Sequence, residues 1–288
     1  MPRSMTGTLY IVATPIGNLE DITQRALRTL REVDLVACED TRRTRVLLNH
    51  FGIKTKTISY HEHNERARAE QLCDEMLTGK NVALVSDAGT PLISDPGFRI
   101  VQAATKRDIP VVPIPGATAL VAALVASGLP SDQFLFAGFL PARANGRRAK
   151  LEELRSVSAM LVFYEAPRRI AATLRAALEV LGNRRAAVAR ELTKLHEEIV
   201  RGSLSELARR FSGATTARGE IVLIISGAAD ELTGRAETSP GDLVARVTEL
   251  ESSGLDARTA LKQSARELGM KRAEAYRLLV AQKNRRTK

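Results

Sequence analysis

The chain has 288 residues, of which 44% are hydrophobic and 26% are charged, and it contains two cysteines. This length predicts about two globular domains, each with a core of its own, and excludes disordered, collagen-like and mini-protein classes. No stretch reaches the roughly 18 apolar residues that a membrane span requires, so we expect a cytoplasmic protein with no membrane partner. Cys38 and Cys73 stand outside any CxxC pattern, which favours reduced thiols.

The net charge is +10, from 43 Lys and Arg against 33 Asp and Glu. A polyanion is the partner that such a balance commonly implies. Residues 1–118 carry 15 basic and 14 acidic side chains, residues 119–228 carry 16 and 10, and residues 229–288 carry 12 and 9. The basic surface is therefore expected after residue 118.

The first 118 residues alternate apolar, β-rich runs with helical patterns. The expected strands are 8–14, 34–40, 56–60, 81–87 and 109–115. The helical patterns are 21–33, 45–51, 65–77 and 99–107. Strands that alternate with helices in this way predict a parallel or mixed sheet in an α/β fold. We expect this N-terminal α/β domain to cover residues 1–120, with a boundary near 118–122.

A helix of small residues over 113–130 leads into a second α/β series, which predicts a C-terminal α/β domain over residues 121–232. From residue 239 onward there is no strand pattern, and residues 239–288 predict a small, basic helical domain. Its segment 260–279 has the look of a helix-turn-helix. A helical cap with solvated charges is an equally good interpretation of the same segment.

Three segments at strand ends carry the strongest functional signals. The first strand runs into ATPIGNLED, at the position where α/β folds hold ligands. It lacks the GxGxxG pattern and Pro15 has no N–H, which disfavours a dinucleotide cradle. Asn18 or Asp21 capping the next helix is the alternative interpretation.

The other two segments follow later strands. VALVSDAGTPLISDPGF at 82–98 contains two Gly, two Pro and two Asp. Gly89 and Gly97 can adopt positive φ or admit a ligand against the backbone, which favours a functional loop over a plain turn. PIPGATAL at 113–120 follows the next strand and also contains Pro and Gly just before a helix. We therefore expect three strand ends to meet at one edge of the sheet.

Four more segments stand out: DLVACEDTRRTRVLL, FLFAGFLP, VFYEAPRRI and ARELTKLHEEIVRG. With the three strand-end segments, they make residues 7 to 228 resemble the tetrapyrrole methylase superfamily. Within it they are similar to the bacterial branch that 2′-O-methylates a cytidine in the decoding region of 16S ribosomal RNA. The resemblance implies two α/β domains with a cleft for S-adenosylmethionine between them. It also implies a homodimer that acts on 16S rRNA within the 30S subunit.

The resemblance further implies which residues bind the methyl donor. They are Pro15, Ile16, Gly17, Gly89, Thr90, Pro91, Leu92, Ile93, Ser94, Pro115, Gly116, Ala117 and Thr118. Two positions depart from family patterns. Thr90 stands where tetrapyrrole enzymes carry Asp, which fits the rRNA branch, and Arg168 stands where that branch is expected to show His. The second departure argues against any role that needs a titrating imidazole there.

Methyl transfer from a sulfonium is an in-line displacement with a neutral leaving group, so it needs neither a metal nor a general acid. A ribose hydroxyl reacts poorly while protonated, and a positioned base contributes about 10²–10⁴-fold. The candidate bases are Glu39, Asp40, Glu165, Glu191 and Lys194, and the sequence does not choose among them. A structural Arg–carboxylate network is an equally weighted interpretation of ACEDTRRT. A lone His196 is interpreted as an exposed polar residue.

An RNA substrate requires Lys and Arg around the donor cleft. The candidates are Arg42, Arg43, Arg143, Arg147, Arg148, Lys150, Arg168, Arg169, Lys271 and Arg272. A solvated surface is the default interpretation of the four between 143 and 150. Arg168 and Arg169 open a helix, where positive charge opposes the helix dipole unless a phosphate or a nearby Glu compensates.

Two other functions fit parts of the sequence. A C-methyltransferase for a corrinoid or siroheme precursor would also use arginines, but SDAGTP in place of a GDP-type loop and the basic tail argue against it. A ligand-sensing DNA-binding regulator would explain the tail but leaves the basic second domain unexplained.

Overall fold

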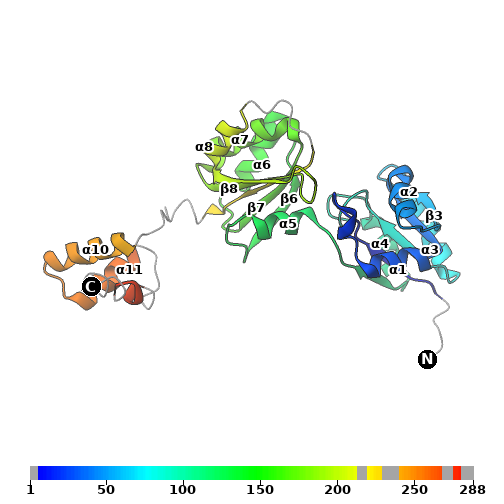
Figure 1. Cartoon of the computed structure of the whole chain (residues 1–288), viewed down its shortest axis with the longest axis horizontal. Helices are drawn as coiled ribbons and strands as arrows, with labels where there is room; N and C mark the ends of the chain where they lie inside the picture. The colour runs from blue at the N-terminus through cyan, green and yellow to red at the C-terminus, as the bar shows by residue number, and fades with distance from the viewer. Residues whose placement is uncertain (1–5, 213–218, 229–239, 268–274, 280–288) are drawn as a thin grey trace. The chain divides into compact units, whose positions relative to one another are not determined.

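The computed structural model describes residues 6–212, 219–228, 240–267 and 275–279. The chain divides into two compact units, residues 1–226 and residues 227–288. The first unit contains two five-stranded sheets with their helices, and the helices of the described tail lie in the second (Figure 1). The domain boundary expected near residue 120 falls inside the first unit and stays a prediction.

The first sheet is parallel, in the strand order β3-β2-β4-β1-β5. Its strands are β1 Leu9–Val12, β2 Leu35–Cys38, β3 Lys56–Ser59, β4 Val82–Val85 and β5 Val111–Ile114. Its helices are α1 Gln24–Glu32, α2 Thr41–His50, α3 Glu65–Leu77 and α4 Phe98–Lys106, with a short 3-10 helix, η1 Leu19–Asp21. This confirms the predicted α/β architecture.

The register of the central strands brings three functional segments together. Strand β4 reads VALV and all four residues are buried, as in strands that helices cover on both faces. Val12 at the end of β1 is in register with Val85 of β4 and with Ile114 of β5. The carboxyl ends of β4, β1 and β5 therefore lie side by side, and the expected meeting of strand ends is confirmed.

The second sheet is mixed, in the order β6-β7-β10-β8-β9, with β6 parallel to β7 and the other pairs antiparallel. Its strands are β6 Phe134–Phe139, β7 Met160–Glu165, β8 Arg185–Arg190, β9 Glu198–Ser203 and β10 Ile221–Ile225. One face is covered by α6 Ala144–Glu153, α7 Ile170–Leu181 and α8 Leu204–Arg210. The other face packs against α5 Ala119–Ala126 (Figure 1). A 3-10 turn, η2 Pro167–Arg169, connects β7 to α7.

The tail contains α10 Pro240–Ser252 and α11 Ala257–Glu267, in agreement with the helical pattern expected from residue 239 onward. The tail has a core of its own, in which Leu243, Val247 and Ala260 are buried. Lys271 and Arg272 lie outside the described residues, as does the middle of the segment 260–279 that has the pattern of a helix-turn-helix. Within the described ranges, no helix is long and apolar enough to cross a membrane.

Candidate active site

A cavity of about 350 Å³ opens at the carboxyl-terminal edge of the first sheet. Loops after β1, β4 and β5 form one wall, and β7, β10 and neighbouring loops of the second sheet form the other. The lining residues are Ile16, Arg43, Asp87, Ala88, Gly89, Thr90, Ile93, Ser94, Asp95, Thr118, Ala119, Phe139, Tyr164, Glu165, Ala166, Pro167, Leu192, Gly219, Glu220, Ile221 and Val222. Its position and its volume are those of a small-molecule site in an α/β protein.

The loop after β4 lines much of the first wall and has a strained backbone. Gly89, Leu92, Ser94 and Gly97 have φ values of 87°, 72°, 67° and 143°. A non-glycine residue held in the left-handed region costs about 1–3 kcal/mol, and such residues gather at functional sites. The backbone geometry of Leu92 and Ser94 therefore supports a functional interpretation of this loop.

Hydrogen bonds join the three strand ends into one surface. Thr14 after β1 exchanges two backbone bonds with Gly89, of 2.8 and 3.0 Å. The Ser86 hydroxyl donates to the Gly89 carbonyl at 3.1 Å, and the Thr90 hydroxyl donates to the carbonyl of Ala117 at 3.2 Å. The first wall is thus preorganised before any ligand arrives.

The structure divides the residues proposed to bind the donor into two groups. Those that line the cavity are Ile16, Gly89, Thr90, Ile93, Ser94 and Thr118. Those that do not line it are Pro15, Gly17, Pro91, Leu92, Pro115, Gly116 and Ala117. A Cβ on Gly17 would collide with the Lys194 side chain, and one on Gly116 would lie 3.0 Å from Ala13 Cβ. These two glycines permit close packing of one protein segment on another.

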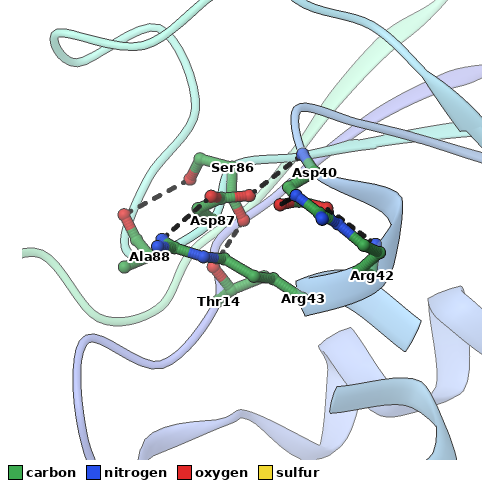
Figure 2. Close-up of polar contacts among 7 residues, drawn as sticks. All are labelled: Thr14, Asp40, Arg42, Arg43, Ser86, Asp87 and Ala88. Atoms are coloured by element: carbon green, nitrogen blue, oxygen red, sulfur yellow. Dashed lines mark hydrogen bonds and ion pairs between the residues drawn. The ribbon is translucent and has the colours of Figure 1, made fainter. Parts of the chain in front are cut away.

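Asp40 and its neighbours form a network of charged side chains at the start of α2 (Figure 2). The Asp40 carboxylate caps the helix by accepting from the Arg42 backbone N–H, and its Oδ2 lies 2.9 Å from the Arg42 guanidinium. Arg43 pairs with Asp87 at 3.1 Å, and Asp87 also accepts from the Asp40 N–H. Hydrogen bonds from Arg42 lower the pKa of Asp40 to about 2, so this carboxylate is a weak base. Glu39 is exposed and does not line the cavity.

Asp95 lines the cavity, and its carboxyl group has a pKa well above the usual value for aspartate. Burial, followed by the negative charges of Glu39, Asp87 and Glu220, raises its pKa to about 6. Within the described part of the chain Asp95 itself forms no ion pair, although Arg43 pairs with the neighbouring Asp87. In the same part of the chain, no group of three or more His, Cys, Asp or Glu is arranged to hold a metal ion.

Glu165 reaches the cavity wall, but its carboxylate is fully engaged by protein groups. Its side chain is 0% exposed and lies 3.1 Å from Nε of Arg169. The Thr173 hydroxyl donates to it at 2.6 Å, and the Ala166 N–H donates at 2.8 Å. Arg169 also donates to the Leu140 carbonyl. A nearby Glu therefore compensates the positive charge at the start of this helix, one of the two explanations that the sequence left open.

The other two candidate bases pair with each other. Lys194 Nζ lies 2.9 Å from the Glu191 carboxylate, which also accepts from the backbone N–H of Glu220. Burial raises the pKa of Glu191, but the hydrogen bonds from Lys194 and Glu220 outweigh it, and the net shift is downward. Neither residue lines the cavity. His196 is exposed, as expected from the sequence.

Most of the described RNA-binding candidates are accessible. Arg42, Arg43, Arg143 and Arg168 are exposed, and Arg43 also lines the cavity. Arg148 pairs with Glu179 at 3.6 Å and half-buried Lys150 pairs with Glu153 at 2.7 Å, both as surface ion pairs.

Arg147 and Arg169 differ from this group. Arg147 is 8% exposed and donates to the Ala142 carbonyl, so the expectation of a fully solvated basic loop is wrong at this position. Arg169 is partly buried against Glu165. Both side chains are held by protein atoms and are poorly placed to meet a phosphate.

Several lining residues escaped the sequence analysis as candidates. They are Asp87, Asp95, Phe139, Tyr164, Leu192 and Glu220. Asp87 and Asp95 belong to the loop already singled out at 82–98, and Phe139, Tyr164 and Leu192 lie in motifs that carry the family resemblance. No local pattern marked Glu220. The last four come from strands and loops of the second sheet, and their place in the cavity depends on how the chain folds back.

The fold and the strand-end cavity define an α/β protein with a small-molecule site at the carboxyl ends of its parallel strands. The chain belongs to the tetrapyrrole (corrin/porphyrin) methylase family, which it matches over residues 8–208. It is 47% identical to a protein of Halalkalibacterium halodurans over 96% of each chain. It is 48% identical to one of Mesorhizobium japonicum over 98% of this chain and 94% of the relative. Both relatives are named ribosomal RNA small subunit methyltransferase I.

The fold is also shared with a solved structure. Uroporphyrin-III C-methyl transferase from Thermus thermophilus, complexed with S-adenyl homocysteine, aligns with a TM-score of 0.54. The alignment covers 77% of this chain and 99% of that chain at 21% identity. This likeness concerns the fold, and the predicted tetrapyrrole methylase architecture is confirmed.

Proposed function

We propose that this protein transfers a methyl group from S-adenosylmethionine to the 2′ oxygen of a cytidine in 16S ribosomal RNA, within the 30S subunit, in the cytoplasm. The observation that carries the proposal is the 47–48% identity, over nearly the whole chain, to relatives named ribosomal RNA small subunit methyltransferase I. The strand-end cavity supplies a site for the donor.

The charge of the cavity fits this donor. S-adenosylmethionine carries a sulfonium and an ammonium against one carboxylate, so its net charge is positive. Arg43 pairs with Asp87, and Glu165 pairs with Arg169. Asp95, which has no ion pair among the described residues, supplies negative charge to the cavity. Glu220 adds an exposed carboxylate that lies 3.9 Å from Lys194.

When bound, S-adenosylmethionine supplies an electrophilic methyl group on sulfur. The protein has to hold the ribose oxygen in line with that carbon, and orientation of this kind contributes about 7–11 kcal/mol in favourable cases. The first wall of the cavity, whose loops are joined by hydrogen bonds, is rigid enough to hold the donor in this orientation. Asp95 is the proposed base that accepts the 2′ hydroxyl proton, because it lines the cavity and its pKa of about 6 is close to working pH.

A labelling experiment tests the proposed function. Tritium-labelled S-adenosylmethionine is offered with 30S subunits, with naked 16S rRNA and with a tetrapyrrole precursor, and labelled nucleosides are mapped. We expect label on the ribose of a cytidine in 30S subunits. Label on the precursor, or no label on RNA, contradicts the proposal.

Gly89→Val should weaken binding of S-adenosylhomocysteine at least about 10-fold, as measured by calorimetry. A β-branched residue is strained at a φ of 87°, and its Cβ would lie 3.4 Å from Cγ2 of Ile16, in the cavity wall. Gly52→Val is the matched control, because Gly52 has a φ of 65° and open space around its Cβ. Unchanged affinity in Gly89→Val, or an equal loss in Gly52→Val, contradicts the placement of the donor.

The helical tail is proposed to contribute to RNA binding. Removal of residues 239–288 deletes most of a segment with 12 basic and 9 acidic side chains. We expect weaker binding to 30S subunits and a shallower dependence of affinity on salt, since fewer phosphates are neutralised. Affinity for S-adenosylhomocysteine should not change. Wild-type RNA affinity in the truncated protein would identify the tail as a cap.

We also propose that the protein is a homodimer. Val121 and Val125 lie exposed on α5, the helix that covers one face of the second sheet. Burying such side chains against a second copy stabilises association at roughly 25 cal/mol per Å² of apolar surface. Sedimentation equilibrium measures the mass in solution directly.

A further inference from the structure

We infer that Phe139 is the stacking platform for the nucleobase of the acceptor nucleotide. This inference rests on the proposed function, because it assigns a part of the same cavity to the RNA substrate. Phe139 ends strand β6, lines the cavity and remains 56% exposed. Exposure of a single aromatic side chain is common in proteins. The backbone that presents this one provides the argument.

Strand β6 contains a bulge that reorients Phe139. Phe136 is in register with Val162, and Phe139 is in register with Tyr164, so three steps along β6 match two along β7. Gly138, inside the bulge, has a φ of 64°. In a regular strand, residues three apart point to opposite faces of the sheet. The extra residue returns Phe139 to the face that Phe136 occupies, and bulges of this kind re-aim side chains beside active sites.

Aromatic contacts confirm the shared face and fix the ring. The Tyr164 ring lies edge-on to Phe136, with centroids 4.9 Å apart, and edge-on to Phe139, with centroids 5.7 Å apart. Tyr164 is itself held from the side of α5: burial raises its pKa, while hydrogen bonding with the Leu120 backbone and the Thr118 side chain acts in the opposite direction. The Phe139 ring therefore packs against the Tyr164 ring, while much of its surface stays accessible to solvent.

The position of the bulge relates Phe139 to the reacting groups. A Cβ on Gly138 would lie 3.6 Å from Oγ of Ser94, in the loop of the first wall. The bulge thus lies close to the proposed donor loop, and Phe139 follows it directly. An accessible aromatic ring at this place can take a splayed base on its face, which is how proteins hold single-stranded RNA.

The donor adenine is the other flat ring that a phenylalanine could contact. The wall assigned to the donor is built from buried or half-buried backbone at Gly89, Thr90 and Thr118. Phe139 belongs to the opposite wall and is one of its most exposed side chains. A base that enters from bulk RNA meets an exposed ring first, so we assign Phe139 to the acceptor.

The test separates binding of the two substrates. In the full-length protein, Phe139→Ala and Phe139→Leu should lower kcat/KM for 30S subunits about 5- to 150-fold, corresponding to the ~1–3 kcal/mol of a base–aromatic stack. The dissociation constant of S-adenosylhomocysteine should stay at the wild-type value. Phe139→Tyr and Phe139→Trp, which keep an aromatic face, should restore most of the activity. Phe134→Ala is the matched control, because Phe134 is an exposed phenylalanine of the same strand outside the cavity.

Each other outcome overturns the inference. A parallel loss of S-adenosylhomocysteine affinity would place Phe139 against the donor, and wild-type kinetics in Phe139→Leu would leave it without a role. Equal activity in the Leu and Tyr variants would show that apolar bulk suffices. If the wild-type protein labels no RNA at all, the proposed function fails first. An active wild type with unaffected Phe139 variants refutes this inference alone.

Discussion

Asp95→Asn should slow methyl transfer to 30S subunits by about 10²–10⁴-fold in single turnovers, the range that a positioned general base contributes. Asparagine has nearly the shape of aspartate but cannot accept the proton of the ribose hydroxyl. Binding of S-adenosylhomocysteine should change little, because that molecule lacks the sulfonium charge that the carboxylate attracts.

The assignment of Asp95 as the base also predicts how the rate of methyl transfer depends on pH. The raised pKa of about 6 means that Asp95 is protonated, and so inactive as a base, below that pH. The wild-type rate should therefore rise with pH up to about 6 and level off above it. Asp95→Asn should lose this rise. Asp40, with its pKa of about 2, contributes nothing to the profile in this range.

Stability should respond in the opposite direction. The folded protein binds the Asp95 proton more tightly than the unfolded chain, whose pKa is near 3.8. This contribution is complete below the unfolded pKa and is lost as pH rises through about 6. The Asn variant, compared with wild type, should thus gain thermal stability at pH 8 relative to pH 4.

Glu220→Gln is the control that separates a base from a general loss of negative charge. Glu220 lines the same cavity and lies 3.9 Å from Lys194. If both variants lose activity equally, the carboxylates act through their field on the donor. A wild-type rate in Asp95→Asn between pH 5 and 8 would contradict the assignment of Asp95 as the base.

The sequence predicts the sheets well because local patterns determine them. The run VALV at 82–85 is apolar throughout, as expected for a strand covered on both faces, and it becomes the fully buried β4. The loop after it could be singled out because Gly and Pro restrict the backbone locally. Its left-handed residues Leu92 and Ser94 could not, since their conformation is imposed by surrounding structure.

The candidate site was predictable on one wall only. Phe139 reads in the sequence as an ordinary apolar strand residue, and only the bulge at Gly138 turns it towards the cavity. The sequence suggests that Gly17 is a ligand-binding glycine. In the structure a side chain is excluded at this position because Lys194 and Thr193, from a distant segment, pack against its Cα. Both cases depend on contacts between residues more than twenty positions apart, which no local pattern encodes.

Arg169→Met should lower the free energy of unfolding by about 3–5 kcal/mol, the usual cost of removing one partner from a buried ion pair. Glu165 has a fully buried side chain, and loss of Arg169 would leave its charge without a cation. Hydrogen bonds from Thr173 and Ala166 would remain but cannot neutralise it. Urea denaturation monitored by circular dichroism measures the change.

Two further variants give this prediction its controls. Glu165→Gln combined with Arg169→Met removes both charges and should recover most of the lost stability, because no unpaired charge stays buried. Arg168→Met alters the exposed neighbouring arginine and should change stability by no more than about 0.5 kcal/mol. Equal effects of the two single arginine variants would contradict the buried pair.

The same variants assign different roles to two adjacent arginines. Arg168 is exposed and forms no ion pair among the described residues. Its replacement should therefore weaken binding to 30S subunits and reduce the salt dependence by about one phosphate contact. Arg169 is held by Glu165 and the Leu140 carbonyl, so its replacement should act through folding. We therefore propose that, of the two arginines at this helix start, Arg168 serves RNA binding and Arg169 serves the fold, and the measured split between affinity and stability decides whether that division is correct.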